Sequence, residues 1–369
     1  MPSIYIIQPY LPNYRLDFFK RLYRVYGPSL KLMYSPFPGD SLYIKPNFPW
    51  AFSVGAWREL LFGFEWQNGV IDIPLKSGDF LVLSGNPRQL STLILFLKAK
   101  FIGVRVIWWG HSWSSSSRRW RQILRFVPMF FSDAVILYTD HELATLRLDT
   151  FAPTRFSLMR ALNNGLDLSL INKYRTRYSA LERETSMLFV GRLTEKSSLF
   201  LLIQALHIIS NPRLTLHVIG DGELFTKLID MAYSLGLSDQ IVWHGQILDE
   251  ENISAVANKC QVFIYPGEVG LSLIHGMAYG LPAIVHDNIK KHMPEIAAFI
   301  EGRTGLSFRY GDVDSLASTI LTMFSDLNRL DYFSAETKTV VGPSFTTKNM
   351  ADRFIALINC LGLPHQYSK

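Results

Sequence analysis

Residues 186–222 read SMLFVGRLTEKSSLFLLIQALHIISNPRLTLHVIGDG, and the fold class can be inferred from them. The two short apolar runs in this stretch, Met187–Val190 and Leu214–Ile219, are typical of buried strands. Between them, Ser198–Ile208 has the length and the apolar spacing of a helix. A strand, a helix and a second strand in this order predict a right-handed βαβ unit with parallel strands.

The same alternation continues on both sides of this unit. Towards the C-terminus we expect strands at Ile241–His244, Val262–Tyr265 and Ala283–Val285, and helices at Glu223–Leu235, Glu250–Asn258 and Leu271–Tyr279. Towards the N-terminus we expect strands at Ser3–Gln8, Phe80–Ser84, Val104–Trp109 and Ala134–Tyr138, and helices at Tyr14–Val25, Gln89–Lys100 and Arg118–Val127. The two groups predict an α/β protein with two parallel sheets, each in a Rossmann-like domain.

A turn signal at Asn163-Asn164-Gly165 and a polar stretch over Lys173–Glu184 place the hinge between the two groups. We therefore expect an N-terminal domain over residues 1–168 and a C-terminal domain over residues 169–345. The helical pattern within residues 346–369 predicts a last helix that packs back onto the N-terminal domain.

Composition limits the function classes. Of 369 residues, 48% are hydrophobic and 18% are charged, which is typical of a folded chain. The net charge of +6 favours an anionic partner, whether nucleic acid, a phosphate-rich ligand or an anionic membrane surface. Cys260 and Cys360 lie in apolar stretches, as reduced thiols of a cytoplasmic protein do. Because we see no signal peptide and no apolar run long enough to span a bilayer, we expect a soluble or peripheral protein.

In open α/β sheets, ligands bind at the loops that follow the carboxyl ends of the strands. One such loop, after Val190, holds Gly191, Arg192 and, four residues further, Lys196. Arginine can grip a phosphate with two hydrogen bonds and lysine adds a mobile charge, so the loop is a candidate diphosphate site. A solvated charged loop explains the same spacing equally well.

A second loop follows Tyr265 and leads into a predicted helix. Its candidate binding residues are Gly267, Glu268, Gly270, Leu271, Ser272 and His275. Glycines before a helix allow backbone N–H groups to approach an anion at the positive end of the helix dipole. His275 lies about one turn into this helix, where it could reach a ligand hydroxyl group; the alternative is a histidine that only packs.

A third loop contains Trp108-Trp109-Gly110-His111-Ser112-Trp113. His111 follows a strand and has aromatic rings of the kind that stack on sugars nearby in the sequence. We expect it to face the second domain across a cleft, and the alternative is a capping or core histidine.

The order of these motifs resembles that of glycosyltransferase family 4, the glycosyl transferases group 1, which has the GT-B fold of two Rossmann-like domains facing each other across a cleft. The resemblance is carried by Gly191-Arg192-Leu193 with Lys196, by Gly220-Asp221-Gly222, by Glu268–Pro282, and by Pro294-Glu295 with Gly302–Leu306. The N-terminal half matches less, at Tyr14 and Arg15, at Gly110-His111, and at Asn164-Gly165. The resemblance implies substrate-binding roles for Tyr14, Arg15, Asn164, Gly220 and Gly222, and catalytic roles for His111, Arg192 and Lys196.

The sequence departs from the family at one pair of positions. The family usually carries two glutamates with seven residues between them, and here Gly267 and His275 stand at those positions. An imidazole can still bond a ribose hydroxyl group, and Glu268 stands beside the glycine.

The resemblance also implies the chemistry. It indicates transfer of a sugar from a nucleotide sugar with retention of configuration, without a metal or another cofactor, to a saccharide or lipid-linked saccharide acceptor, as in assembly of O-antigen or capsule. Because the Arg/Lys cluster lies at ligand loops, we do not expect a nucleic acid partner. An inactive nucleotide-sugar-binding or scaffold protein remains the alternative, with a phosphorylase or sugar epimerase of the same fold as a minor one.

The predicted helix at residues 118–127 combines an apolar stripe with basic residues, and its candidate membrane-binding residues are Arg118, Arg119, Trp120, Arg121 and Arg125. A cationic amphipathic helix suits an anionic headgroup layer, so we expect peripheral attachment at the inner face of the cytoplasmic membrane. An ordinary surface helix explains the pattern equally well.

Overall fold

The computed structural model describes residues 2–36, 47–111, 126–148 and 158–362. By its contacts the chain divides into two compact units. Unit 1 comprises residues 1–163 and 347–369, and unit 2 comprises residues 164–346.

Unit 1 is built on a parallel sheet with the strand order β3-β2-β1-β6-β7-β8-β9. The strands are β1 Ile4–Gln8, β2 Leu30–Tyr34, β3 Ala51–Ser53, β6 Phe80–Ser84, β7 Arg105–Trp109, β8 Ala134–Leu137 and β9 Met159–Ala161. Side chains alternate across it, so Ile4 and Ile6 belong to one buried core and Tyr5 and Ile7 to the other.

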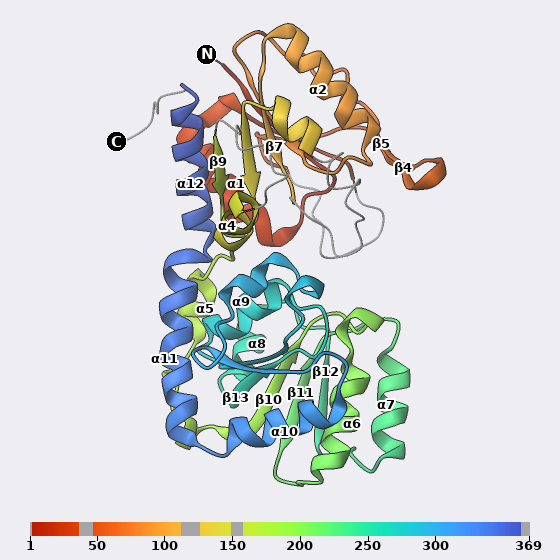
Figure 1. Cartoon of the computed structure of the whole chain (residues 1–369), viewed down its shortest axis with the longest axis vertical. Helices are drawn as coiled ribbons and strands as arrows, with labels where there is room; N and C mark the ends of the chain where they lie inside the picture. Colours follow the sequence, from red (N-terminus) through yellow and green to blue (C-terminus); the bar gives the residue numbers. More distant parts are fainter. Residues whose placement is uncertain (1, 37–46, 112–125, 149–157, 363–369) are drawn as a thin grey trace. The chain divides into compact units, whose positions relative to one another are not determined.

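Helices cover both faces of this sheet (Figure 1). On the face of Ile4 and Ile6 lie α1 (Leu16–Tyr26) and α12 (Thr347–Cys360). On the other face lie α2 (Leu90–Ile102), a helical segment at 126–131 and α4 (Asp140–Leu148).

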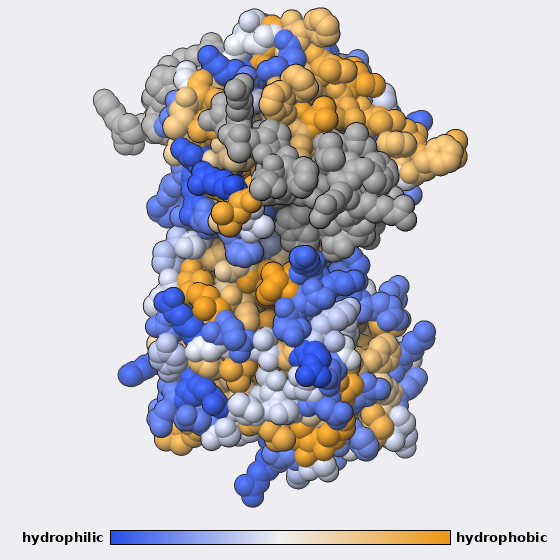
Figure 2. Space-filling model, in the orientation of Figure 1, coloured by the Kyte–Doolittle hydropathy of each residue, from blue (hydrophilic) through white to orange (hydrophobic). Residues whose placement is uncertain are grey.

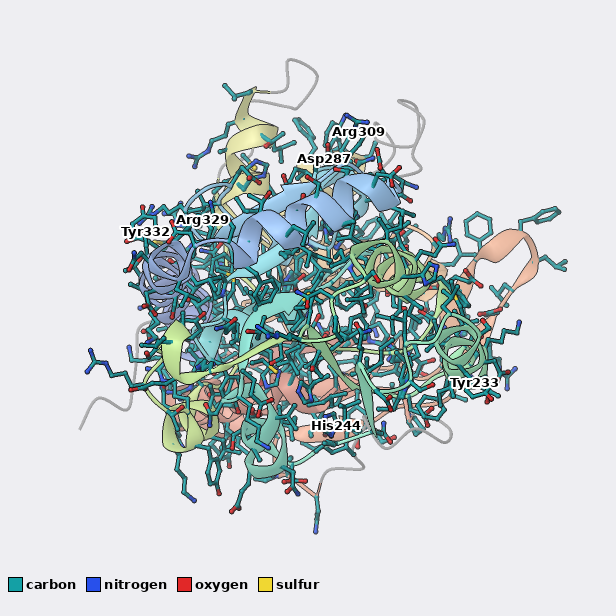
Figure 3. The ribbon with its side chains drawn as sticks, turned by 90° about the horizontal axis from the view of Figure 1, so that it is seen from below. Tyr233, His244, Asp287, Arg309, Arg329 and Tyr332 are labelled. Carbon is teal, nitrogen blue, oxygen red and sulfur yellow. The ribbon has the colours of Figure 1, made fainter. Side chains whose placement is uncertain are left out.

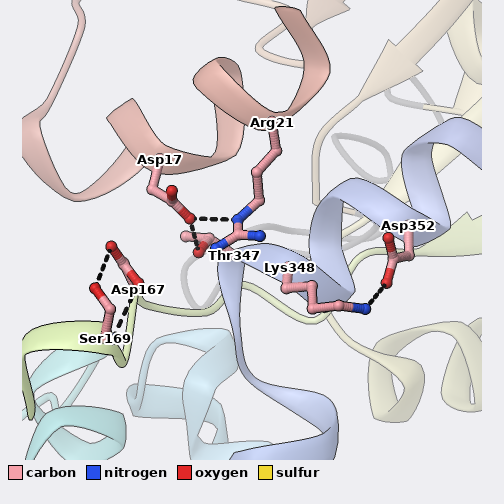
Figure 4. Close-up of polar contacts among 7 residues, drawn as sticks. All are labelled: Asp17, Arg21, Asp167, Ser169, Thr347, Lys348 and Asp352. Atoms are coloured by element: carbon pink, nitrogen blue, oxygen red, sulfur yellow. Dashed lines mark hydrogen bonds and ion pairs between the residues drawn. The ribbon is translucent and has the colours of Figure 1, made fainter. Parts of the chain in front are cut away.

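The last helix joins unit 1 through a specific contact at its start. Thr347 donates a hydrogen bond from its hydroxyl group to the Asp17 carboxylate of α1, and Arg21 pairs with the same carboxylate (Figure 4). The apolar side of α12 packs against α1 and completes this core, with Met350, Phe354, Leu357 and Ile358 buried in it.

Unit 2 is a second parallel sheet, with the order β12-β11-β10-β13-β14-β15. Its strands are β10 Glu184–Val190, β11 Thr215–Ile219, β12 Ile241–Gly245, β13 Cys260–Ile264, β14 Ala283–His286 and β15 Gly305–Phe308. Its helices are α5 Ser169–Tyr174, α6 Leu199–Ile209, α7 Phe225–Ser234, α8 Glu250–Ala257, α9 Leu271–Ala278, α10 Val313–Phe324 and α11 Leu327–Ser344. Figure 3 shows the chain from below, with His244 of β12 and Asp287, just after β14, towards opposite edges of this sheet.

The expectation of two parallel α/β sheets is confirmed. The strands expected at Phe80–Ser84 and Leu214–Ile219 appear as β6 and β11, and the helix expected at Ser198–Ile208 appears as α6. The antiparallel hairpin of β4 (Trp57–Glu59) and β5 (Glu65–Gln67) was not expected. Its tip exposes Leu61 and Phe62, and Figure 2 shows it as a hydrophobic projection.

Candidate functional site

The strand order of unit 2 reverses between β10 and β13, which are neighbours in the sheet although two strands lie between them in the sequence. Loops on either side of such a reversal diverge and leave room for a ligand at the carboxyl edge of the sheet. The loop after β10 contains Gly191–Lys196, and the loop after β13 contains Gly267–Gly270. The two predicted donor loops therefore flank the reversal point.

Three glycines bring these loops together. A Cβ atom at Gly220 would lie 1.9 Å from the Gly191 carbonyl oxygen, and one at Gly267 would lie 2.0 Å from the Lys196 carbonyl oxygen. A Cβ atom at Gly222 would lie 2.5 Å from the Leu193 carbonyl oxygen. No side chain fits at these distances, so the glycines let the loops after β10, β11 and β13 pack backbone against backbone.

Hydrogen bonds fix the same arrangement. The Gly191 N–H group donates to the Ile219 carbonyl (3.0 Å), and the Leu193 N–H group donates to the Asp221 carbonyl (2.9 Å). The Glu268 N–H group donates to the Lys196 carbonyl (2.9 Å). The backbone around Arg192 and Lys196 is thus held from both sides.

The two predicted cations differ in their surroundings. Lys196 Nζ lies 3.5 Å from Glu268 Oε2, and the two side chains are 69% and 27% exposed. Such an exposed pair is weak, so Lys196 can leave it for a phosphate. Arg192 is exposed and forms no ion pair with the residues that the structure describes. Burial raises the pKa of Tyr265, just after β13, to about 12, and the positive charge of Arg192 acts to lower it.

The start of α9 presents free backbone donors. Gly270 is the N-cap residue, and within the described chain the N–H groups of Gly270 and Leu271 donate to no acceptor. The Ser272 side chain is partly exposed at the same helix end. These groups carry the positive end of the helix dipole, so the predicted anion site has its donors in place.

His275 has a partner that the sequence did not indicate. Its Nε2 lies 2.8 Å from Oε1 of Glu250, the first residue of α8, and the Tyr279 hydroxyl group donates to the same oxygen. Burial acts to raise the pKa of Glu250, but the hydrogen bonds from His275 and Tyr279 prevail and lower it. Glu250 is therefore ionised. Because it bonds Nε2 of His275, Nδ1 of this ring is available to another partner.

Asn164 lies in unit 2 and not in the N-terminal domain, where we expected it. It donates from Nδ2 to Oε1 of Glu295, and both side chains are buried. Asn164 thus has a partner in its own unit, and its predicted contact with substrate stays a prediction.

In unit 1, the structure brings His111, Arg15 and Tyr14 towards one another at the carboxyl ends of β1, β7 and β8. The His111 ring stacks on Tyr138 at 4.2 Å between centroids, and its Nδ1 lies 3.7 Å from Oε1 of Glu142. The half-exposed His111 side chain keeps access to solvent.

Arg15 lies buried beside this stack. It donates from Nη1 to Oε1 of Gln8 (3.1 Å), and its guanidinium carbon lies 4.9 Å from the Trp109 ring centroid and 6.0 Å from that of Tyr138. The centroid of the Tyr14 ring lies 5.7 Å from the same carbon, and this side chain is exposed. Arg15 thus supports the aromatic rings, and Tyr14 and His111 are the members of the group that a ligand could touch.

The predicted membrane-binding residues Arg118, Arg119, Trp120, Arg121 and Arg125 lie outside the described residues. No helix among the residues that were described is long and apolar enough to cross a membrane. Across the same residues, no group of three or more His, Cys, Asp and Glu side chains is arranged to hold a metal ion.

The two units, their parallel sheets and the loops at the reversal point define a protein of the GT-B fold. HepE of Anabaena, solved in complex with UDP, superposes on the chain with a TM-score of 0.68 at 13% identity, covering 98% of this chain and 100% of that one. Residues 171–340 match the family model described as glycosyl transferases group 1.

Two curated relatives show the same likeness. A sulfoquinovosyl transferase of Arabidopsis thaliana is 27% identical over 201 residues, which are 51% of this chain and 36% of that protein. An uncharacterized glycosyltransferase of Methanocaldococcus jannaschii is 27% identical over 116 residues, 30% of each chain. The chain thus matches about a third of the length of these relatives.

The sequence did not single out Glu250, Tyr138 or Glu142. Glu250 opens a helix that was expected, but its partner His275 is 25 residues away, and no local spacing links them. Tyr138 and Glu142 follow β8, where the strand-end argument that found His111 could have found them too.

Proposed function

We propose that the chain is a glycosyltransferase that moves a sugar from a nucleotide sugar held by unit 2 to a saccharide acceptor. The observation that carries the proposal is the group of three glycine-packed loops at the reversal point, which presents Arg192, Lys196 and the N–H groups of Gly270 and Leu271. These groups can bind a diphosphate together, and they lie in the segment that matches the glycosyl transferases group 1.

The same groups support a mechanism without a metal. When the sugar–phosphate bond breaks, negative charge grows on the leaving diphosphate. The side chains of Arg192 and Lys196 and the N–H groups at the start of α9 stabilise that charge where it develops. In the proposed retaining route the leaving phosphate accepts the proton of the acceptor hydroxyl group, so the protein supplies no carboxylate base.

A thermal-shift screen against UDP-, GDP- and ADP-sugars tests the proposal. A ligand that binds the native state raises the melting temperature by mass action. We expect one of the three nucleotides to give a shift that saturates with concentration, and UDP is the first to try because HepE was solved with it. No shift with any nucleotide sugar would contradict the proposal.

We propose that unit 1 binds the acceptor. His111 offers ring nitrogens and Tyr14 an exposed ring, which suits a sugar with hydroxyl groups and apolar faces. We propose a lipid-linked saccharide, in assembly of a cell-surface polysaccharide at the cytoplasmic membrane. Exposed apolar side chains of unit 1 support contact with a membrane, at Leu61, Phe62, Leu97, Phe101, Phe130 and Phe131.

A second candidate is a binding protein of the same fold without activity. It is favoured by Gly267, where the family usually has a glutamate. A side chain at this position would overlap the Lys196 carbonyl group, so this loop cannot carry the glutamate there. Glu268 is beside it but pairs with Lys196. Slow hydrolysis of the donor or transfer of its sugar would exclude this candidate; saturable binding with neither would establish it.

A further inference from the structure

The backbone of the donor loop after β13 is held by a histidine from a different element. The Val269 N–H group donates to Nδ1 of His292 (3.2 Å), and the Val269 carbonyl accepts a hydrogen bond from the Met293 N–H group (3.0 Å). Val269 is fully buried and His292 nearly so. Both polar groups of this residue are therefore satisfied by the segment that follows β14.

The hydrogen bonds of His292 determine where its proton lies. Since Nδ1 accepts from Val269, it carries no hydrogen, and the hydrogen of the neutral ring is on Nε2. Nε2 lies 2.9 Å from the His286 carbonyl oxygen and donates to it. The other tautomer would lose both hydrogen bonds.

The neighbourhood keeps this ring neutral and in place. The His286 ring stacks on it with centroids 3.7 Å apart and planes 15° apart, and His286 is itself buried. Burial lowers the pKa of His292, and burial together with the neighbouring His292 lowers that of His286 to about 3.

Val269 immediately precedes the N–H groups proposed to bind the diphosphate. Glu268 donates its N–H group to Lys196 and Val269 donates to His292, whereas the N–H groups of Gly270 and Leu271 find no acceptor in the described chain. Two consecutive N–H groups of the loop are thus bonded within the protein, and the next two are available to a ligand. Without an acceptor on His292, the buried Val269 N–H group would be unsatisfied and the loop would rotate to reach one.

We propose that His292 is a positioning residue for the donor diphosphate: by accepting from Val269 it orients the N–H groups of Gly270 and Leu271 towards the ligand. This inference rests on the proposed function. It assigns His292 no contact with the nucleotide, so the effect of its loss is confined to binding of the phosphates.

The test compares a nucleoside diphosphate with its nucleoside by titration calorimetry, using UDP, GDP and ADP beside uridine, guanosine and adenosine. We expect His292→Leu to weaken binding of the diphosphate about tenfold and to change that of the nucleoside less than twofold. His292→Asn keeps an oxygen acceptor near the position of Nδ1 and should recover most of the loss. His217→Leu, which removes another buried histidine of unit 2, should bind both ligands as the wild type does.

Equal binding of the diphosphate by wild type and His292→Leu would overturn the inference, as would an equal loss for diphosphate and nucleoside. If His292→Leu does not fold, His292→Asn and His292→Gln decide, since glutamine keeps a donor for His286 but places no acceptor near Val269. Asparagine should then bind the diphosphate more tightly, and the reverse order overturns the inference. If the wild type binds no diphosphate, the proposed function itself fails and this inference fails with it.

Discussion

At the scale of single residues, Arg192 and Lys196 carry the largest expected effect. Arg192→Ala or Lys196→Ala should lower turnover at least about a hundredfold, on the order of 3 kcal/mol of lost charge stabilisation. Both side chains are exposed on a loop, so the melting temperature should not change. Steady-state kinetics with the donor found by the screen measures the effect.

The matched control is Arg309→Ala. Arg309 is also an exposed arginine of unit 2, follows β15 and pairs with Asp312 (3.0 Å). Its loss should leave turnover unchanged. If the Arg192 and Lys196 variants behave like this control, the diphosphate does not bind at the loop after β10.

His275 gives a second prediction at this scale. Because Glu250 holds Nε2, Nδ1 can bond a ribose hydroxyl group, and His275→Ala should weaken nucleotide binding by roughly 1–2 kcal/mol. The alternative is that His275 only joins α9 to α8. In that case the variant lowers the melting temperature and leaves the nucleotide affinity unchanged. Tyr279→Phe is the control with this behaviour, since Tyr279 also bonds Glu250.

At the scale of elements, the hydrogen bond at the start of α12 tests how this helix is held against the rest of unit 1. Thr347→Val keeps the shape of the buried side chain and removes its hydrogen bond to Asp17 (Figure 4). We expect the free energy of unfolding of unit 1 to fall by about 1 kcal/mol, as judged by urea denaturation. Lys348→Ala, which breaks an exposed pair with Asp352, should change it by less than about 0.5 kcal/mol. Equal effects of the two changes would mean that the Asp17 contact does not stabilise the docking of α12.

The elements also show what could be predicted from the sequence. Alternating apolar runs and helical spacing predicted β1, β6, β7, β8 and the strands β10 to β14, because buried parallel strands are nearly continuous apolar runs. The strands β2, β3, β9 and β15 of the two parallel sheets were missed. Of these, β3 (Ala51–Ser53) and β9 (Met159–Ala161) have only three residues, too few to show a periodicity. The long helix α11 was missed as well.

The donor loops could be predicted for a simple physical reason: their chemistry lies in glycines and cations that follow strands directly. Glu250 and His292 could not, because each reaches its partner through folding of a distant segment. Gly267 is intermediate. The sequence identified it as a departure from the family, but the contact with the Lys196 carbonyl that requires a glycine there is visible in the structure alone.

At the scale of the whole molecule, activity should not depend on a metal. Arg192, Lys196 and the helix N–H groups supply the positive charge, so transfer should continue in excess EDTA. Loss of activity in EDTA that Mg²⁺ or Mn²⁺ restores would contradict this mechanism.

Attachment to membranes is the second prediction for the whole molecule. Residues 118–125 contain four arginines, and each basic residue near an anionic surface contributes about 1 kcal/mol. We expect the wild type to co-sediment with liposomes that contain anionic lipid at low salt and to dissociate at high salt. A variant with Arg118, Arg119, Arg121 and Arg125 changed to Ser should stay in solution; if it sediments like the wild type, these arginines are not the anchor.

The central claim is that unit 2 binds and activates a nucleotide sugar through the loops after β10 and β13. Its most direct measurement is the release of nucleoside diphosphate from the donor that stabilises the protein most, with wild type and the Arg192→Ala/Lys196→Ala double variant compared in EDTA. We predict slow release by the wild type without an acceptor, and release at least about a hundredfold slower by the double variant. Equal release by both proteins, or a wild type that binds the donor and never releases the diphosphate, would contradict the claim.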